Sequence, residues 1–161
     1  MARGMKVFTG ENAPLSVGVL STLYRTPPQK VKGIGTGAAY AAGDAFGLTN
    51  EVSVPVKGTI AYITFTDFDG EAIQKDIFFF NAPIDPTTDN DPYGPSDADL
   101  RKWVGVASVF VYYAAANNQV GIAYPALPYV APRGILYYQL VTRGADNIAA
   151  TYEPEISFVV V

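Results

Sequence analysis

Between residues 58 and 80 the side chains alternate with a period of two, and this pattern constrains the fold more than any other feature. The stretch "GTIAYITFT" places two sets of side chains on opposite faces of an extended strand, Ile60, Tyr62, Thr64 and Thr66 against Ala61, Ile63 and Phe65. The stretch "DFDG" follows, and Asp69-Gly70 is a strong hairpin signal. The pattern therefore predicts that "EAIQKDIFFF" returns as the antiparallel partner of the first strand.

The other apolar runs are short, rich in β-branched and aromatic residues, and broken by Gly, Pro, Asn and Asp, as in an all-β domain. The further strand candidates are residues 52–56, 103–113, 121–124, 135–141 and 156–161. The stretch "YAAGDAFG" favours a strand with a tight turn over a helix, because glycine and aspartate interrupt its alanines. The chain is therefore predicted to be all-β, an antiparallel β-sandwich of about eight strands, either jelly-roll-like or Ig-like.

One short helix is predicted near residues 96–102, in "PSDADLRKW". Ser96 can accept a hydrogen bond from the backbone N–H three residues on, as a helix N-cap does. Asp97 and Asp99 then lie where a helix favours negative charge, and Arg101 and Lys102 lie where it favours positive charge. One or two helical turns are expected.

The chain has few charges for its length. With 161 residues it fits one domain core. Charged residues make up 16% of the sequence, whereas about 25% is usual for soluble domains. Since a lone domain needs a largely charged surface, the deficit predicts that other subunits cover part of this one, in a homo-oligomer.

Residues 1–37 form no periodic pattern and contain adjacent prolines and repeated glycines, so they are predicted to be an extended arm, with a sandwich domain at residues 38–161. An apolar stripe in the arm predicts that it becomes ordered only on assembly, along a neighbouring subunit or another partner surface. The free edges of the sandwich, including its last strand, are expected to pair across subunits. The interface candidates are Val17, Val19, Leu20, Leu23, Tyr24, Arg25 and Val161.

The sequence contains neither histidine nor cysteine. This excludes His-dependent catalytic triads, thiol nucleophiles and nearly all protein zinc sites. A carboxylate pair, an activated lysine or an oxygen-ligand metal site would remain, but the prediction is a protein that is not an enzyme and has no cofactor. The scattered Lys and Arg residues predict no nucleic-acid partner. The lack of a long apolar run or signal sequence predicts no membrane span and synthesis in the cytoplasm.

The loop "IDPTTDNDPYGPSD", residues 84–97, has three readings: a metal site, a catalytic acid cluster or a turn region. An EF-hand match fails at Tyr93 and Leu100, which replace oxygen ligands at the fifth and twelfth loop positions. A looser calcium site could use Asp85, Asp89 and Asp91. The favoured reading is a surface turn region that caps the following helix, with no dedicated metal site, because Asp, Asn and Pro are turn residues.

Eleven tyrosines and one tryptophan give the chain many aromatic rings. The pairs Tyr112-Tyr113 and Tyr137-Tyr138 each direct one ring to each face of a strand, so one ring of each pair is expected in the core. The outward rings fit a subunit interface first, since tyrosine is enriched there. A platform that stacks on sugars is the second reading.

From about residue 40 onward, four segments and a closing strand occur in a familiar order: "YAAGDAFG", "GTIAYITFTDFDGEAIQKDIFFFNAP", "DNDPYGPSDADLRKWVGVASV" and "LYYQLVTRGADN". In this order and spacing the chain resembles small virion structural proteins encoded beside the capsid genes of tailed bacteriophages, of the decoration or cement kind. The resemblance implies a β-sandwich on the capsid surface of the virion, with the major capsid protein and its own copies as partners, as dimers or trimers. It implies no enzyme activity and no cofactor. A phage-surface or host-directed module that binds glycans through exposed tyrosines is the alternative.

Overall fold

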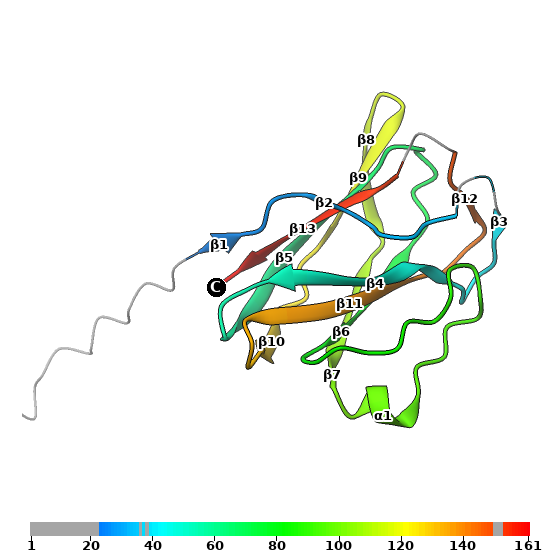
Figure 1. Ribbon diagram of the computed structural model, residues 1–161. Coiled ribbons are helices and arrows are strands. Elements are labelled where there is room, and N and C mark those ends of the chain that lie inside the picture. The colour runs from blue at the N-terminus through cyan, green and yellow to red at the C-terminus, as the bar shows by residue number, and fades with distance from the viewer. Residues whose placement is uncertain (1–22, 36, 38, 150–152) are drawn as a thin grey trace, which may run out of the picture.

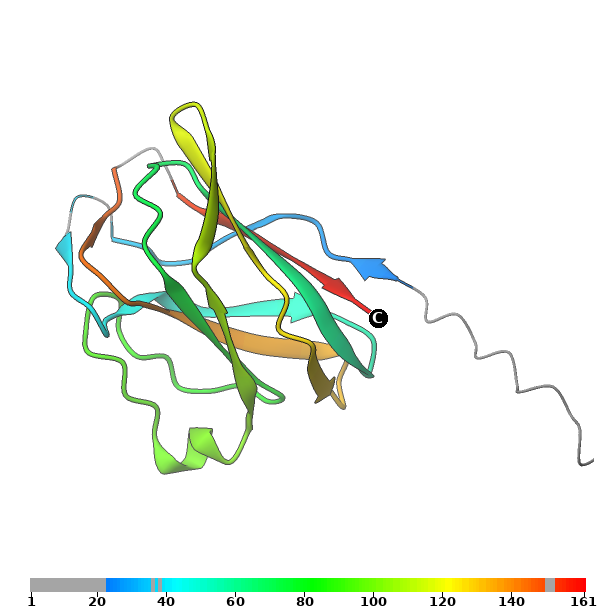
Figure 2. The same cartoon turned by 180° about the vertical axis from the view of Figure 1, so that it is seen from behind.

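The computed structural model describes residues 23–35, 37, 39–149 and 153–161, and in this part of the chain it is an antiparallel β-sandwich with one short helix (Figures 1 and 2). The predicted fold class is confirmed. The strands are β1 (Tyr24–Arg25), β2 (Gln29–Lys30), β3 (Ala39–Tyr40), β4 (Ala45–Ser53), β5 (Lys57–Asp67), β6 (Lys75–Phe80), β7 (Trp103–Val109), β8 (Val111–Ala115), β9 (Asn118–Ala123), β10 (Leu127–Val130), β11 (Ile135–Thr142), β12 (Asp146–Asn147) and β13 (Glu155–Val160). The helix is α1 (Asp97–Leu100).

Two sheets form the layers of the sandwich. The larger sheet has the strand order β1-β13-β5-β9-β8, with β2 also paired to β13 and β10 also paired to β5. The smaller sheet has the order β4-β11-β6-β7, and β12 and β3 form a separate pair. Among the described strands, every pair is antiparallel.

The core lies between the two sheets and is rich in aromatic rings. Phe158 of β13 contacts Phe79 of β6 and Tyr138 of β11, with ring centroids 5.7 Å and 5.2 Å apart. Ile63 and Phe65 point into the same core from β5, as the alternating pattern predicts. Ile60, predicted on the opposite face, is also buried in this core, because the pairing of β5 with β13 shifts register between Tyr62 and Ile60. The inward face of each sheet thus stabilises the other by removing apolar surface from water.

The predicted hairpin at Asp69-Gly70 is wrong. The chain does turn there, but β5 belongs to the larger sheet and β6 to the smaller one, so the loop between them crosses from one layer to the other. The buried Asp67 carboxylate holds this loop by accepting the backbone N–H groups of Asp69, Gly70 and Ala72. A turn signal predicts a reversal of direction, but it does not say whether the flanking strands pair with each other.

The single strand predicted for residues 103–113 is two strands. The chain leaves the smaller sheet after β7, passes Phe110, and enters the larger sheet as β8. The predicted helix is confirmed as α1, and Ser96 is its N-cap, with the Ser96 hydroxyl accepting the Asp99 N–H at 3.2 Å. The turn predicted in "YAAGDAFG" is also present, between β3 and β4.

The second half of the predicted arm belongs to the sandwich. The short strands β1 and β2 both pair with β13, and Val31 is 2% exposed and lies in the core. The structure therefore differs from a sandwich that begins at residue 38, because residues 23–35 supply edge strands and a core side chain. The structure also contradicts a free edge at the last strand, since β13 has β5 on one side and β1 and β2 on the other.

Candidate protein-binding surface

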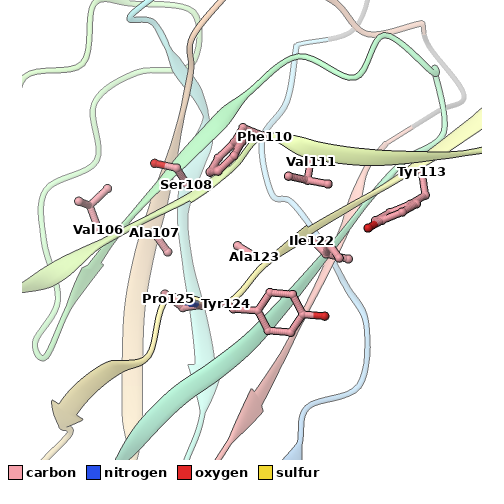
Figure 3. A pocket seen from close by; sticks show the side chains of 10 residues that line it. All are labelled: Val106, Ala107, Ser108, Phe110, Val111, Tyr113, Ile122, Ala123, Tyr124 and Pro125. Atoms are coloured by element: carbon pink, nitrogen blue, oxygen red, sulfur yellow. The ribbon is translucent and has the colours of Figure 1, made fainter.

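An apolar groove of about 510 Å³ lies where the two sheets meet along β7, β8 and β9 (Figure 3). Its side chains come from the end of β7, from Phe110, from β8, and from the end of β9 with Tyr124 and Pro125 after it. Five of them are large and exposed: Val106, Phe110, Val111, Tyr113 and Tyr124. The groove therefore lies where the chain passes from the smaller sheet, at the end of β7, to the larger sheet, at the start of β8.

The groove lies beside two edge strands. In the part of the chain that the structure describes, β7 pairs only with β6, and β8 pairs only with β9. At Gly121 of β9 an added Cβ would lie 2.5 Å from Val109 of the smaller sheet and 2.7 Å from the Tyr112 ring of the neighbouring strand β8. Glycine at this position therefore lets β9 pack under the crossover that carries Phe110.

Within the part of the chain that the structure covers, none of the side chains that line the groove is charged. Phe110 is 66% exposed and Tyr124 is 72% exposed, so their rings project from the surface and do not fill the core. The Tyr124 ring packs against Tyr62, with centroids 5.0 Å apart, which limits its freedom to move. Exposed apolar side chains gathered in one place are typical of surfaces that bind another protein or a flat apolar ligand.

The predicted interface residues lie elsewhere. Leu23, Tyr24 and Val161 are exposed at the end of the sandwich where β1 and β13 meet (Figure 1). The exposed Arg25 is the second residue of β1. Val17, Val19 and Leu20 lie outside the described residues. Contact of these residues with a partner stays a prediction, although the edge-strand reason given for Val161 does not hold.

The tyrosine pairs follow the predicted faces in part. Tyr112 packs on the core while Tyr113 is exposed at the groove. Tyr138 lies in the main core, but its neighbour Tyr137 is also buried, because a second apolar cluster on the outer side of the smaller sheet covers it. That cluster contains Ile84, so the aspartate-rich loop lies over this sheet face. The sequence alone could not show that this loop covers Tyr137.

Asp89 is the structural centre of the aspartate-rich loop. Its carboxylate accepts the Gly35 N–H at 2.7 Å, the Gly47 N–H at 2.6 Å and the Tyr40 hydroxyl at 2.9 Å. Burial, and then the hydrogen bond to Asp89, raise the pKa of the Tyr40 hydroxyl, so Tyr40 stays a donor at neutral pH. Asp89 therefore ties the loop to β4 and to the segment before β3.

The calcium candidates do not converge. Asp85 and Asp91 are exposed, and Asp89 faces backbone donors. Among the residues described by the structure, no group of three or more acidic side chains is arranged to hold a metal ion.

Millimolar calcium is expected to leave the melting temperature of the protein unchanged, and EDTA is expected to have no effect. A ligand that binds only the folded chain must stabilise it, so differential scanning fluorimetry with and without calcium tests this directly. A rise of several degrees that EDTA reverses would show a cation site.

The described part of the chain is thus a β-sandwich with an uncharged, partly aromatic groove beside two edge strands. In the part of the chain that the structure covers, no helix could span a membrane. No family model, no curated protein and no solved structure matches the chain.

Proposed function

We propose that this chain is a non-enzymatic structural protein of a tailed-bacteriophage virion, a decoration or cement protein that binds the capsid shell and its own copies. The observation that carries the proposal is the apolar groove beside β7 and β8. An edge strand next to exposed apolar side chains offers a partner both backbone hydrogen bonds and buried surface. The low fraction of charged residues, 16%, fits a surface that is covered after assembly.

The groove is the proposed contact with the major capsid protein or with a second copy. Replacing Phe110 and Tyr124 by lysine places two charges where the partner's apolar surface would be, and desolvating an unpaired charge is costly. The double variant is expected to fold as the natural chain does, since exposed positions tolerate substitution. Its binding to shells is expected to fall at least about tenfold, which equals about 1.4 kcal/mol.

The measurement is co-sedimentation with tailed-phage capsids that lack the protein, together with sedimentation velocity of the protein alone. The matched control is Leu100→Lys, because Leu100 is 50% exposed on α1 and lies outside the groove. The control is expected to bind as the natural chain does. Equal binding by the groove variant and the control would place the contact on another surface, and no binding by the natural chain would reject the shell role.

The exposed rings of Tyr113 and Tyr124 favour one alternative, a glycan-binding module. A sugar would stack on these rings without any particle present. Binding of saccharides by the isolated protein, lost on Tyr113→Ala or Tyr124→Ala, would support this alternative. A structural protein is expected to ignore the same sugars and to sediment with shells.

A further inference from the structure

A lysine and an aspartate meet inside the sandwich at the end where β3 and β12 lie, opposite the C-terminus (Figure 1). Lys75 is the first residue of β6 and Asp146 the first residue of β12, and Lys75 Nζ lies 2.5 Å from Asp146 Oδ2. Their side chains are only 2% and 3% exposed. The two reactive groups are thus in contact and almost completely shielded from water.

The surroundings of the lysine are largely aromatic. Its Nζ lies 4.7 Å from the centroid of the Phe46 ring and 5.7 Å from that of the Phe65 ring, and it donates to the Ile73 carbonyl at 2.9 Å. Desolvation lowers the pKa of Lys75, while the negative charge of Asp146 opposes this. A larger fraction of this amine is therefore neutral than on the protein surface, and the neutral amine is the nucleophile.

A second carboxyl group adjoins the aspartate on the solvent side. Desolvation, and then a side-chain hydrogen bond to Asp146, raise the pKa of Glu71. The Asn147 N–H donates to Glu71 Oε2 at 2.9 Å and holds this side chain beside β12. Glu71 is thus placed to give a proton to Asp146 and to take one back, and its exposure lets water leave.

We propose that Lys75 and Asp146 condense in the folded chain to an isopeptide bond, with Glu71 as the proton shuttle. A proton passes from the Lys75 ammonium to the Asp146 carboxylate across their direct contact, which leaves a neutral amine and a carboxylic acid. The Nζ lone pair forms a bond to Asp146 Cγ, and the C=O electrons move to oxygen. Nζ gives a proton to the Asp146 oxygen that it contacts. Glu71, which is hydrogen-bonded to Asp146, moves a proton between the two Asp146 oxygens so that one becomes water, the C–O bond breaks, and that water leaves. Nothing is oxidised or reduced.

Two physical terms favour this step. First, the folded chain holds the amine and the carboxyl group in contact, so the reaction needs no bimolecular encounter. A near-attack arrangement needs the reacting atoms to be about 3–3.5 Å apart. Asp146 Oδ2 is bonded to the carbon that Nζ would attack, so the observed contact is close to this arrangement. Burial penalises the two charges of an ion pair, whereas a neutral amide carries no such penalty.

The bond would join the smaller sheet to the β3–β12 pair and close the chain between residues 75 and 146. The sequence has no cysteine, so no disulfide can provide such a link. A covalent tie at this end of the sandwich is independent of whether the groove binds a capsid shell.

The test is intact-mass spectrometry of the full chain under denaturing conditions. The expected mass is lower than the sequence mass by one water, and a tryptic digest is expected to contain the Lys75 peptide joined to the Asp146 peptide. Cyclisation at Asp69-Gly70 would also remove one water, but it would give no linked peptides. The full sequence mass, or a loss of water without the linked pair, would overturn the proposal and leave an ion pair.

One variant distinguishes a role of Glu71 in proton transfer from a role in packing. Glu71→Gln leaves Lys75 and Asp146 in contact but removes the acid, so this chain is expected to keep the sequence mass while folding. Glu51→Gln, at an exposed position on β4, is the matched control and is expected to lose water as the natural chain does. A linked product in Glu71→Gln at the natural rate would overturn the role of Glu71.

Discussion

A chain that starts at Ala38 is expected to be less stable than the full chain by an amount on the order of 5 kcal/mol. This truncation removes β1, β2 and Val31, whose burial alone is worth about 1.5–3 kcal/mol. It also removes Thr26, whose N–H donates to the Phe158 carbonyl and whose hydroxyl accepts the Phe158 N–H, both at 2.9 Å. Each lost hydrogen bond adds about 1 kcal/mol.

Thermal unfolding followed by circular dichroism measures this effect. For a chain of this size a loss on that scale lowers the melting temperature by roughly 10–20 °C. The control is a chain that starts at Leu23, which keeps every contact described above and is expected to melt with the full chain. Equal melting of the chains that start at residues 23 and 38 would show that the packing of β1 and β2 on β13 contributes little.

Replacing Asp89 by alanine is expected to cost about 4 kcal/mol of unfolding free energy. The substitution leaves the Gly35 and Gly47 N–H groups and the Tyr40 hydroxyl without their acceptor, and each unsatisfied donor costs about 1–3 kcal/mol. The buried Tyr40 hydroxyl has the least access to water as a replacement. Urea unfolding followed by tyrosine fluorescence measures the change as a lower midpoint.

Asp91→Ala is the matched control, since it removes an equal charge from the same loop at an exposed position. It is expected to change stability by less than about 0.5 kcal/mol, as surface substitutions usually do. Equal midpoints for the two variants would mean that Asp89 does not anchor the loop. Asp89→Asn is expected to fall between them, because its one carbonyl oxygen can replace part of the carboxylate.

The strands of the core and the capped helix could be predicted from the sequence because their signals are local. The alternation in residues 58–67 comes from the geometry of a strand, and the bond from the Asp99 N–H to Ser96 spans three residues. Pairing between strands depends on parts of the chain far apart in sequence. Asp69-Gly70 therefore predicts a turn correctly and a hairpin wrongly, because it carries no information on which sheet receives β6.

The apolar groove and the Lys75–Asp146 pair could not be located from the sequence, because both depend on which distant parts of the chain come together. Phe110 and Tyr124 look like ordinary strand residues, and only the crossing between sheets brings both to the lining of one groove (Figure 3). An activated lysine is one of the few chemistries left by the residue composition. Its identity as Lys75 depends on Asp146, which lies far along the chain and comes close only when the layers close.

The place of β13 in the larger sheet has a consequence for synthesis. Residues 155–160 supply a strand between β5 and the pair β1 and β2. A ribosome adds about 5–20 residues per second, so β5 is made several seconds before the strand that pairs with it. Until residue 160 leaves the exit tunnel, Ile63 and Phe65 on β5 lack the Phe158 side of their core. A ribosome that stalls before residue 155 would therefore hold a chain with an open sheet and exposed aromatic rings, which is the form that chaperones bind and proteases cut.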